Sequence, residues 1–116
     1  MNELAIDPRE VMAASTDPAA TQRLAAYWAA RDRFIAVGRA VRPSPDARTM
    51  LAQVREPLLA VLRSSPDFRP AYDPLLRMAG ALARSDPRAG RELLQQLVSA
   101  QPARSEARAA LNALAP

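Results

Sequence analysis

Apolar side chains recur at helical spacing over most of the chain. The clearest pattern lies in residues 67–84, where apolar residues fall every three or four positions on one face and arginines lie opposite. The residues of this apolar face are Phe68, Tyr72, Leu75, Ala79 and Leu82. Similar stripes run through residues 45–64, 87–100 and 103–115. This spacing predicts amphipathic helices, and no stretch has the period of two that is typical of a strand.

Aspartate–proline and serine–proline pairs mark the expected helix starts. An Asp or Ser side chain accepts a hydrogen bond from the free N–H groups of a first turn. A proline placed next loses only an N–H that would have no partner there. The pairs and triplets are Asp7-Pro8, Asp17-Pro18, Asp73-Pro74, Asp86-Pro87, Ser44-Pro45-Asp46 and Ser65-Pro66-Asp67. They predict six helices, at residues 8–14, 18–41, 45–64, 67–84, 87–100 and 103–115.

Four prolines constrain the middle of the chain, because a proline inside a helix costs roughly 3 kcal/mol or more. We expect Pro66 to end the third helix and Pro70 to lie in the first turn of the fourth. Pro74 is tolerated if regular hydrogen bonding begins near Asp73, and otherwise it bends the fourth helix. Pro57 lies well inside the third helix and is expected to kink it.

The chain also contains an internal similarity. The stretch LLAVLRSSPDFRPAYDPL (58–75) aligns with LLQQLVSAQPARSEARAAL (93–111) after one insertion, and Pro66 and Pro102 lie 36 residues apart. A period of about 34 residues or slightly more, with two helices per unit, is typical of helical hairpin repeats.

The same segments resemble the tetratricopeptide (TPR) family. Its pattern of large residues around a small one on the first helix is matched by Phe34, Val37, Gly38 and Val41. Pro66 then resembles the proline that closes the unit, and a second unit runs from Tyr72 to Pro102, with Leu76 in place of the usual glycine. The resemblance implies an all-α stack of antiparallel helix hairpins, with about two degenerate repeats and a capping helix over residues 17–116. Residues 1–16 would be an N-terminal extension with a short helix.

A second resemblance concerns YWAARDRFIAVGRAV (27–41) and SPDFRPAYDPLLRMA (65–79). Both are similar to the helical tail that follows the catalytic domain in some bacterial membrane-anchored spermidine synthase-like proteins, which are polyamine aminopropyltransferases. The resemblance implies that the chain is a C-terminal accessory domain, with an adjacent domain of a longer chain as its partner. The family's catalytic acids and glycine-rich loop have no match here, so no catalytic residue is carried over.

Composition narrows the chemistry. The chain has no Cys and no His, which excludes disulfides, thiol or histidine metal ligands and a histidine base. We therefore expect a non-catalytic protein without cofactor or metal. All sixteen cations are arginines, and the net charge is +4 with a pI near 10.9. The arginines alternate with acids and aromatics make up only 4%, which disfavours nucleic-acid binding.

Targeting signals are not evident. MNELAIDPRE carries charges where a signal peptide needs an apolar core, and no apolar run approaches the roughly 18 residues of a membrane span. We expect a cytoplasmic location, either for a free protein or for the cytoplasmic part of a membrane-anchored one.

The expected function is protein–protein interaction or scaffolding, with a groove formed by the first helix of each pair. The alternatives are the accessory domain of an aminopropyltransferase and a self-association module that forms homo-oligomers. The candidate partner-binding residues are Tyr27, Trp28, Arg31 and Tyr72. Adjacent aromatics point about 100° apart, so one of Tyr27 and Trp28 should pack in the core and the other nearer an edge.

Arg31 lies within an apolar stripe of the second predicted helix. It is expected to pair with an acid on a neighbouring helix, to face a ligand in a groove, or to occupy an exposed edge. The hypothesis of a binding role predicts that Arg31→Met leaves folding intact and weakens partner binding. Small residues line the other side of this helix: Ala25, Ala26, Ala29, Ala30, Ala36 and Ala40. Because they allow a second helix to approach closely, we expect residues 18–41 to be the most buried segment.

Overall fold

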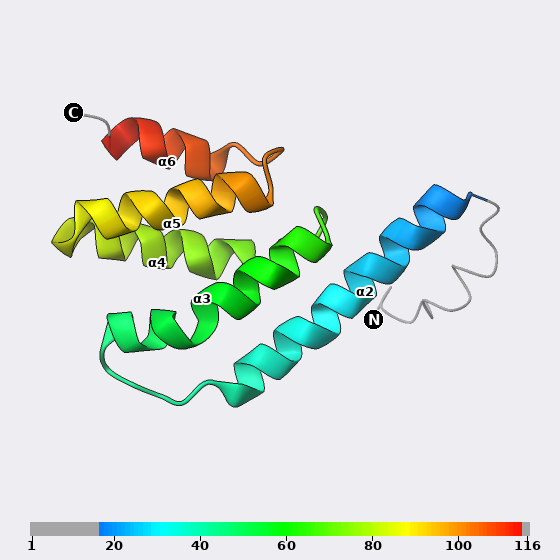
Figure 1. Ribbon diagram of the computed structural model, residues 1–116, viewed down its shortest axis with the longest axis horizontal. Helices are drawn as coiled ribbons and strands as arrows, with labels where there is room; N and C mark the ends of the chain where they lie inside the picture. Colours follow the sequence, from blue (N-terminus) through cyan, green and yellow to red (C-terminus); the bar gives the residue numbers. More distant parts are fainter. Residues whose placement is uncertain (1–16, 115–116) are drawn as a thin grey trace, which may run out of the picture.

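The computed structural model describes residues 17–114, and this part of the chain is all-α, as predicted. Five helices follow one another without a strand in the described range (Figure 1). They are α2 (Pro18–Ala40), α3 (Ala47–Ser64), α4 (Tyr72–Ser85), α5 (Pro87–Ala100) and α6 (Glu106–Leu114). The predicted helix at residues 8–14 lies outside the described residues.

The helices stack as antiparallel hairpins. α4 packs on α5 and α5 on α6, while α3 covers both α4 and α5 (Figure 1). α2 runs antiparallel to α3 at one end of the stack, and α3 is the one described helix on which it packs. Gly90 allows α4 and α5 to approach closely, because an added Cβ there would lie only 2.6 Å from the Cβ of Ala83.

Two of the predicted helix starts, those of α2 and α5, are confirmed by capping hydrogen bonds. The third helix begins two residues later than predicted, at Ala47, and its cap is Asp46 and not Ser44. The Asp17 carboxylate accepts from the N–H of Ala19 at 3.0 Å, and Pro18 follows at the first helical position. Asp46 caps α3 by accepting from Arg48 at 3.2 Å, and Asp86 caps α5 by accepting from Ala89 at 3.2 Å. α5 occupies residues 87–100, as its Asp-Pro start predicted.

The prediction that α4 starts at residue 67 is wrong. α4 begins at Tyr72, with Ala71 before it and no side-chain cap. Asp73 is the second residue of the helix and not its cap, and its carboxylate accepts two hydrogen bonds from Arg69, at 3.0 and 3.2 Å. Pro74 therefore falls in the first turn, where it removes no helical hydrogen bond. Pro70 lies in the turn before the helix and not, as predicted, within its first turn.

Turns with the same backbone hydrogen bond end α3 and α5. The N–H of Phe68 donates to the carbonyl of Ser65 at 3.2 Å, and that of Arg104 donates to the carbonyl of Gln101 at 3.1 Å. These turns lie 36 residues apart, in agreement with the predicted period. The second turn also explains why α6 begins at Glu106 and not at residue 103.

Gln101 joins the two turns. Its side-chain amide, which is 1% exposed, shares its N–H groups among the carbonyls of Leu62, Ser65 and Phe68, at 3.3, 2.9 and 3.2 Å. This amide satisfies the carbonyl of Leu62 in the last turn of α3 and two carbonyls of the turn that follows. Gln101 therefore fixes α5 against the end of α3.

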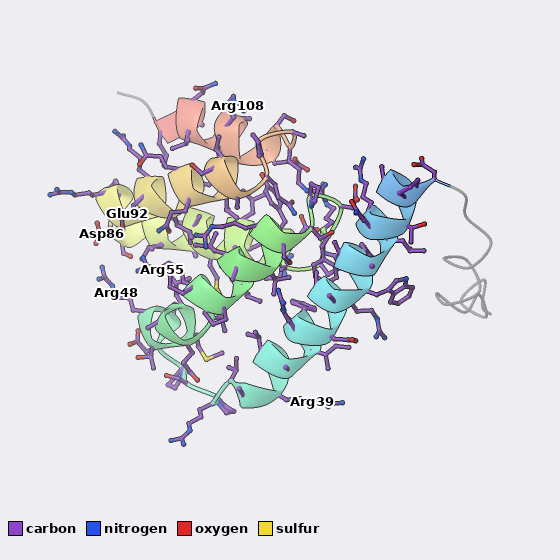
Figure 2. The ribbon with its side chains drawn as sticks, turned by 45° about the vertical axis from the view of Figure 1, so that its right-hand side comes forward. Arg39, Arg48, Arg55, Asp86, Glu92 and Arg108 are labelled. Atoms are coloured by element: carbon purple, nitrogen blue, oxygen red, sulfur yellow. The ribbon has the colours of Figure 1, made fainter. Side chains whose placement is uncertain are left out.

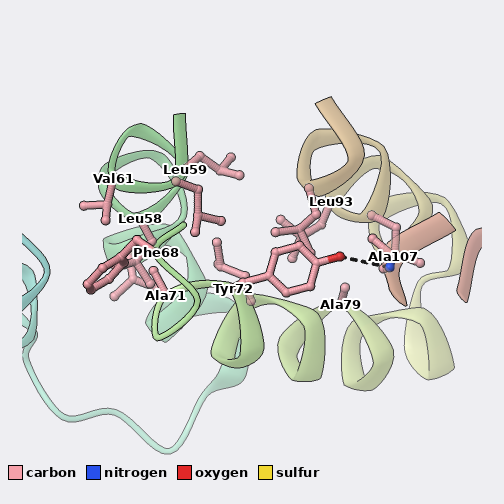
Figure 3. Close-up of a cluster of buried hydrophobic side chains, with 14 of the residues drawn as sticks. Leu58, Leu59, Val61, Phe68, Ala71, Tyr72, Ala79, Leu93 and Ala107 are labelled. Carbon is pink, nitrogen blue, oxygen red and sulfur yellow. Dashed lines mark hydrogen bonds between the residues drawn. The ribbon is translucent and has the colours of Figure 1, made fainter. Parts of the chain in front are cut away.

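The core lies between α3, α4, α5 and the start of α6 (Figure 3). Its largest fully buried side chains are Tyr72, Phe68, Leu59, Leu62, Leu75, Leu93, Leu94 and Leu97. Tyr72 is 0% exposed, and its hydroxyl accepts a hydrogen bond of 3.0 Å from the N–H of Ala107 (Figure 3). This bond satisfies one of the free N–H groups in the first turn of α6.

α2 is not the most buried segment, contrary to the prediction. Ala30 is its one buried residue, whereas six residues of α3 are buried. The reason is positional: α2 ends the stack and packs on α3 alone among the described helices, so most of the predicted alanine side faces solvent.

Pro57 lies inside α3, as predicted, and the ribbon of α3 changes direction partway along the helix (Figure 1). Pro57 has no N–H to offer the carbonyl one turn earlier, which accounts for the bend.

Candidate functional site

Two neighbouring stripes run along α2, and only one of them faces the core. The core stripe consists of Tyr27, Ala30, Phe34, Val37 and Val41, which pack against the buried cluster of the other helices. The second stripe consists of Leu24, Trp28, Arg31 and Ile35, and we name it the α2 flank. Its spacing of four, three and four residues places these side chains on one side of the helix. Its three apolar members are half-buried, and in the described structure they do not belong to the core packing.

The two adjacent aromatics divide as the sequence predicted. Tyr27 packs inward, with its ring centroid 5.4 Å from that of Phe68. Trp28 lies on the flank and meets Tyr27 edge to face, with a centroid distance of 5.7 Å and an interplanar angle of 89°. Trp28 is the single tryptophan of the chain.

Arg31 occupies an exposed edge. Its side chain is 50% exposed, and its guanidinium lies 5.6 Å from the ring centroid of Trp28, within the range of a cation–π contact. The nearest acid is Asp32 on the same helix, with Nη1 and Oδ1 3.8 Å apart. The expected ion pair with a neighbouring helix is not formed, because the stripe that holds Arg31 is turned away from α3. Of the three expected positions for Arg31, the structure has the exposed edge.

Tyr72 lies far from this surface. Its side chain is fully buried and its hydroxyl is bonded to Ala107, so it has no surface to present to a partner in this structure. The side chains of Arg69 and Arg104 approach its ring at 5.8 and 5.5 Å. Tyr72 is therefore a core residue in this structure and not a partner-binding residue, while Trp28 and Arg31 lie on the flank and Tyr27 lies on the core stripe beside it.

A groove of about 420 Å³ extends the flank toward the N-terminus of α2. It is lined by Ala20, Arg23, Leu24, Tyr27 and Asp67. Arg23 donates two hydrogen bonds to Asp67, at 2.7 and 2.5 Å, and thereby ties α2 to the turn that follows α3. These bonds hold the pKa of the Asp67 carboxyl below its ordinary value. Leu24 belongs to both groove and flank, so the two form one continuous surface.

The opposite flank of α2 borders a second groove, of about 430 Å³, between α2 and α3. Its lining is Ala36, Val37, Ala40, Val41, Gln53 and Pro57. The Gln53 amide bonds both the N–H and the carbonyl of Arg42, at 2.7 and 2.9 Å, and so fixes the loop between the helices. α2 and α4 do not contact each other, so the first helices of the two hairpins do not form a continuous groove within the described residues.

Positive charge is densest on α2. Residues 18–42 carry five arginines and one aspartate, whereas residues 43–116 carry ten arginines and seven acids. On α3, Arg48 and Arg55 are paired with Asp86 and Glu92, at 3.1 and 3.7 Å (Figure 2). Arg39, by contrast, projects from the end of α2 (Figure 2) and forms no ion pair with another described residue.

The sequence places Arg31 in an apolar stripe of this helix, but the prediction did not separate the core stripe from the flank, to which the half-buried Leu24 and Ile35 belong. The sequence does contain a signal that identifies the core stripe, because the stripe beside Arg31 carries no charge. Its residues are Tyr27, Ala30, Phe34, Val37 and Val41. An uncharged stripe is the better candidate for the core, and a stripe interrupted by arginine is the better candidate for a surface.

Comparisons with known proteins add no relative. The sequence matches no protein-family model, and neither a curated protein nor a solved structure is detectably similar to it. None of the described helices combines the length and the apolar character that crossing a membrane requires. In residues 17–114, Asp and Glu side chains do not gather into a group of three that could hold a metal ion. The fold and the surface therefore define the chain as an all-α helical hairpin stack with an apolar and basic flank.

Proposed function

We propose that this chain is a non-catalytic protein-binding module of the tetratricopeptide-like type, and that the α2 flank is its docking surface. One observation carries the proposal: Leu24, Trp28 and Ile35 lie in line on α2, outside the core packing, and among the described helices α2 packs on α3 alone. Tryptophan and arginine are among the residue types most enriched at the energetic centres of protein interfaces, and the two aliphatic side chains enlarge the apolar area around them.

The contrast with the other end of the stack supports the proposal. The exposed residues of α6 are small or polar: Arg108, Ala109, Asn112 and Ala113. Terminal helices of repeat arrays need such an outer face to remain soluble. α2 is also terminal among the described helices, but its flank is apolar, which is typical of a surface that another protein covers.

The two alternative functions would use the same surface with another occupant. In an aminopropyltransferase accessory domain, the occupant would be the adjacent catalytic domain. In a self-association module, it would be a second copy of the chain. The experiment must therefore report the identity of the occupant.

Site-specific photo-crosslinking in the native cell tests the proposal. A photoreactive phenylalanine analogue replaces Ile35 on the flank, and a matched protein carries it at Ala109, which is exposed on α6. We expect a discrete adduct with another protein from position 35 and none from position 109. The additional substitution Arg31→Met should reduce the adduct without lowering the thermal unfolding midpoint. Equal adducts from both positions, or none from position 35, would refute a docking role for the flank, and an adduct of twice the chain's mass would indicate self-association.

A further inference from the structure

We infer that the occupant of the α2 flank is an acidic amphipathic helix of another protein. The inference rests on the proposed function and specifies the chemistry of the partner. The length of the flank, its charge and the geometry of Arg31 support this partner.

The length of the flank fits one short helix. Leu24 and Ile35 are eleven residues apart, which corresponds to roughly 16 Å at 1.5 Å per residue. A partner helix of about three to four turns covers this distance and can place apolar side chains beside Leu24, Trp28 and Ile35. This is the helix-in-groove mode, in which apolar residues of one helix face dock on a shallow apolar strip.

The charge of the flank selects an acidic partner. Arg31 lies in line between Trp28 and Ile35, and Arg39 lies one turn beyond Ile35. Asp32 is the single acid of α2, and its 3.8 Å contact with Arg31 is too long for a hydrogen bond. The guanidinium of Arg31 is half exposed over Trp28 and forms no hydrogen bond with another described residue, so its donors can meet a carboxylate of the partner.

A second copy fits the flank less well. Pairing two α2 helices would bring the arginines of one copy against those of the other, and like charges placed across an interface oppose binding. A nucleic acid also fits less well, because phosphates are bound by rows of cations. On this flank Leu24 and Ile35 occupy the positions on either side of Trp28 and Arg31.

The fluorescence emission of Trp28 can report binding to the flank, because Trp28 is the single tryptophan of the chain and belongs to the flank. The probes are two tryptophan-free amphipathic peptides of about 14 residues with identical apolar positions, one with glutamate and the other with lysine at the polar positions. We expect the glutamate peptide to change the Trp28 emission and to saturate at roughly micromolar concentration, which is the weak end of the range for protein interfaces. Binding should weaken about tenfold between about 50 mM and about 500 mM NaCl, because the attraction is screened. The lysine peptide should leave the emission unchanged.

Variants test the contribution of each part of the flank. Arg31→Gln and Arg39→Gln should each weaken binding of the glutamate peptide about threefold, as expected for an exposed ion pair. Ile35→Gln should weaken it about tenfold through the loss of apolar contact. Arg77→Gln is the matched control: Arg77 is exposed on α4 and forms no ion pair with a described residue, so its loss removes the same charge without an effect on binding. Far-UV circular dichroism verifies that all variants are folded.

The outcomes separate this inference from the proposed function. Equal binding of both peptides would overturn the acidic partner and leave the docking surface intact. An emission shift on concentrating the protein alone, with a doubled mass in light scattering, would overturn it in favour of a second copy. Binding of a 20-nucleotide single strand that depends on Arg31 and Arg39 would overturn it in favour of nucleic acid. A Trp28 emission that responds to none of these additions would overturn both proposals.

Discussion

Replacing Tyr72 with phenylalanine tests the bond that ties α4 to α6. The substitution removes one oxygen atom and keeps the fully buried ring in place. It deprives the N–H of Ala107 of its acceptor, which lies 3.0 Å away in the intact protein. Because Ala107 is 0% exposed, water cannot take the place of the hydroxyl without a structural change.

The burial of the Ala107 N–H determines how much unfolding free energy the substitution should remove. A buried donor left without a partner costs about 1–3 kcal/mol, more than the loss of an exposed hydrogen bond. For a domain of about 100 residues, 1 kcal/mol shifts the melting midpoint by about 5 °C. We therefore expect Tyr72→Phe to lower the unfolding free energy by about 2 kcal/mol and the melting midpoint by about 10 °C.

Urea unfolding followed by circular dichroism at 222 nm measures the change. The matched control is Tyr27→Phe, the same chemical change at the only other tyrosine, whose ring is half-buried against Phe68. Tyr27→Phe should change the unfolding free energy by less than about 0.5 kcal/mol. Equal losses in the two variants would refute the assigned role of the Tyr72 hydroxyl. Tyr72→Phe should also leave peptide binding to the α2 flank unchanged, because Tyr72 is a core residue.

Three further predictions concern packing, pH and local stability. Gly90→Ala should lower the unfolding free energy by about 1–3 kcal/mol, because the added methyl group clashes with α4. Gly80→Ala should raise it by about 0.5–1 kcal/mol, because the space around the new Cβ is open. Urea unfolding measures both changes. Hydrogen bonds from Arg69 hold the pKa of Glu106 below its ordinary value. This stabilisation is present at neutral pH and is lost as the pH falls through the lowered pKa. The urea midpoint should therefore fall in acid, and Glu106→Gln should reduce the fall. The same dependence of the urea midpoint on pH in both proteins would contradict the role of this ion pair. Amide hydrogen exchange should be faster in α2 than in α4 and α5, because α2 packs on one described helix only, and slower exchange in α2 would contradict this packing.

Two helix starts could be predicted from their Asp-Pro pairs. Asp17 and Asp86 directly precede a proline, and both cap their helices as expected. The Asp73-Pro74 pair looks the same in sequence, but Arg69 takes up the Asp73 carboxylate, and the helix begins at Tyr72. A local pattern shows that a side chain can cap a helix, but it does not show at which residue the helix begins in the folded chain.

The candidate site could be predicted in part. The neighbouring positions of Tyr27, Trp28 and Arg31 and the division between the two aromatics followed from helical geometry alone. The burial of Tyr72 did not, because its hydrogen-bond partner Ala107 lies 35 residues further along the chain. The low burial of α2 as a whole depends on which of the described helices ends the stack, and the amphipathic pattern of a single helix does not contain this property of the tertiary arrangement.

The matching turns at the ends of α3 and α5 make the chain extensible. The segment from Pro66 to Gln101 begins directly after Ser65, whose carbonyl accepts the hydrogen bond of the first turn, and ends at Gln101, whose carbonyl accepts that of the second. A tandem copy of this segment, inserted after Gln101, would be joined through a junction that the protein already contains, with the inserted glutamine placed to bridge the preceding turn. Each insertion would lengthen the rod by one helix pair and leave both of its ends, including the α2 flank, chemically unaltered.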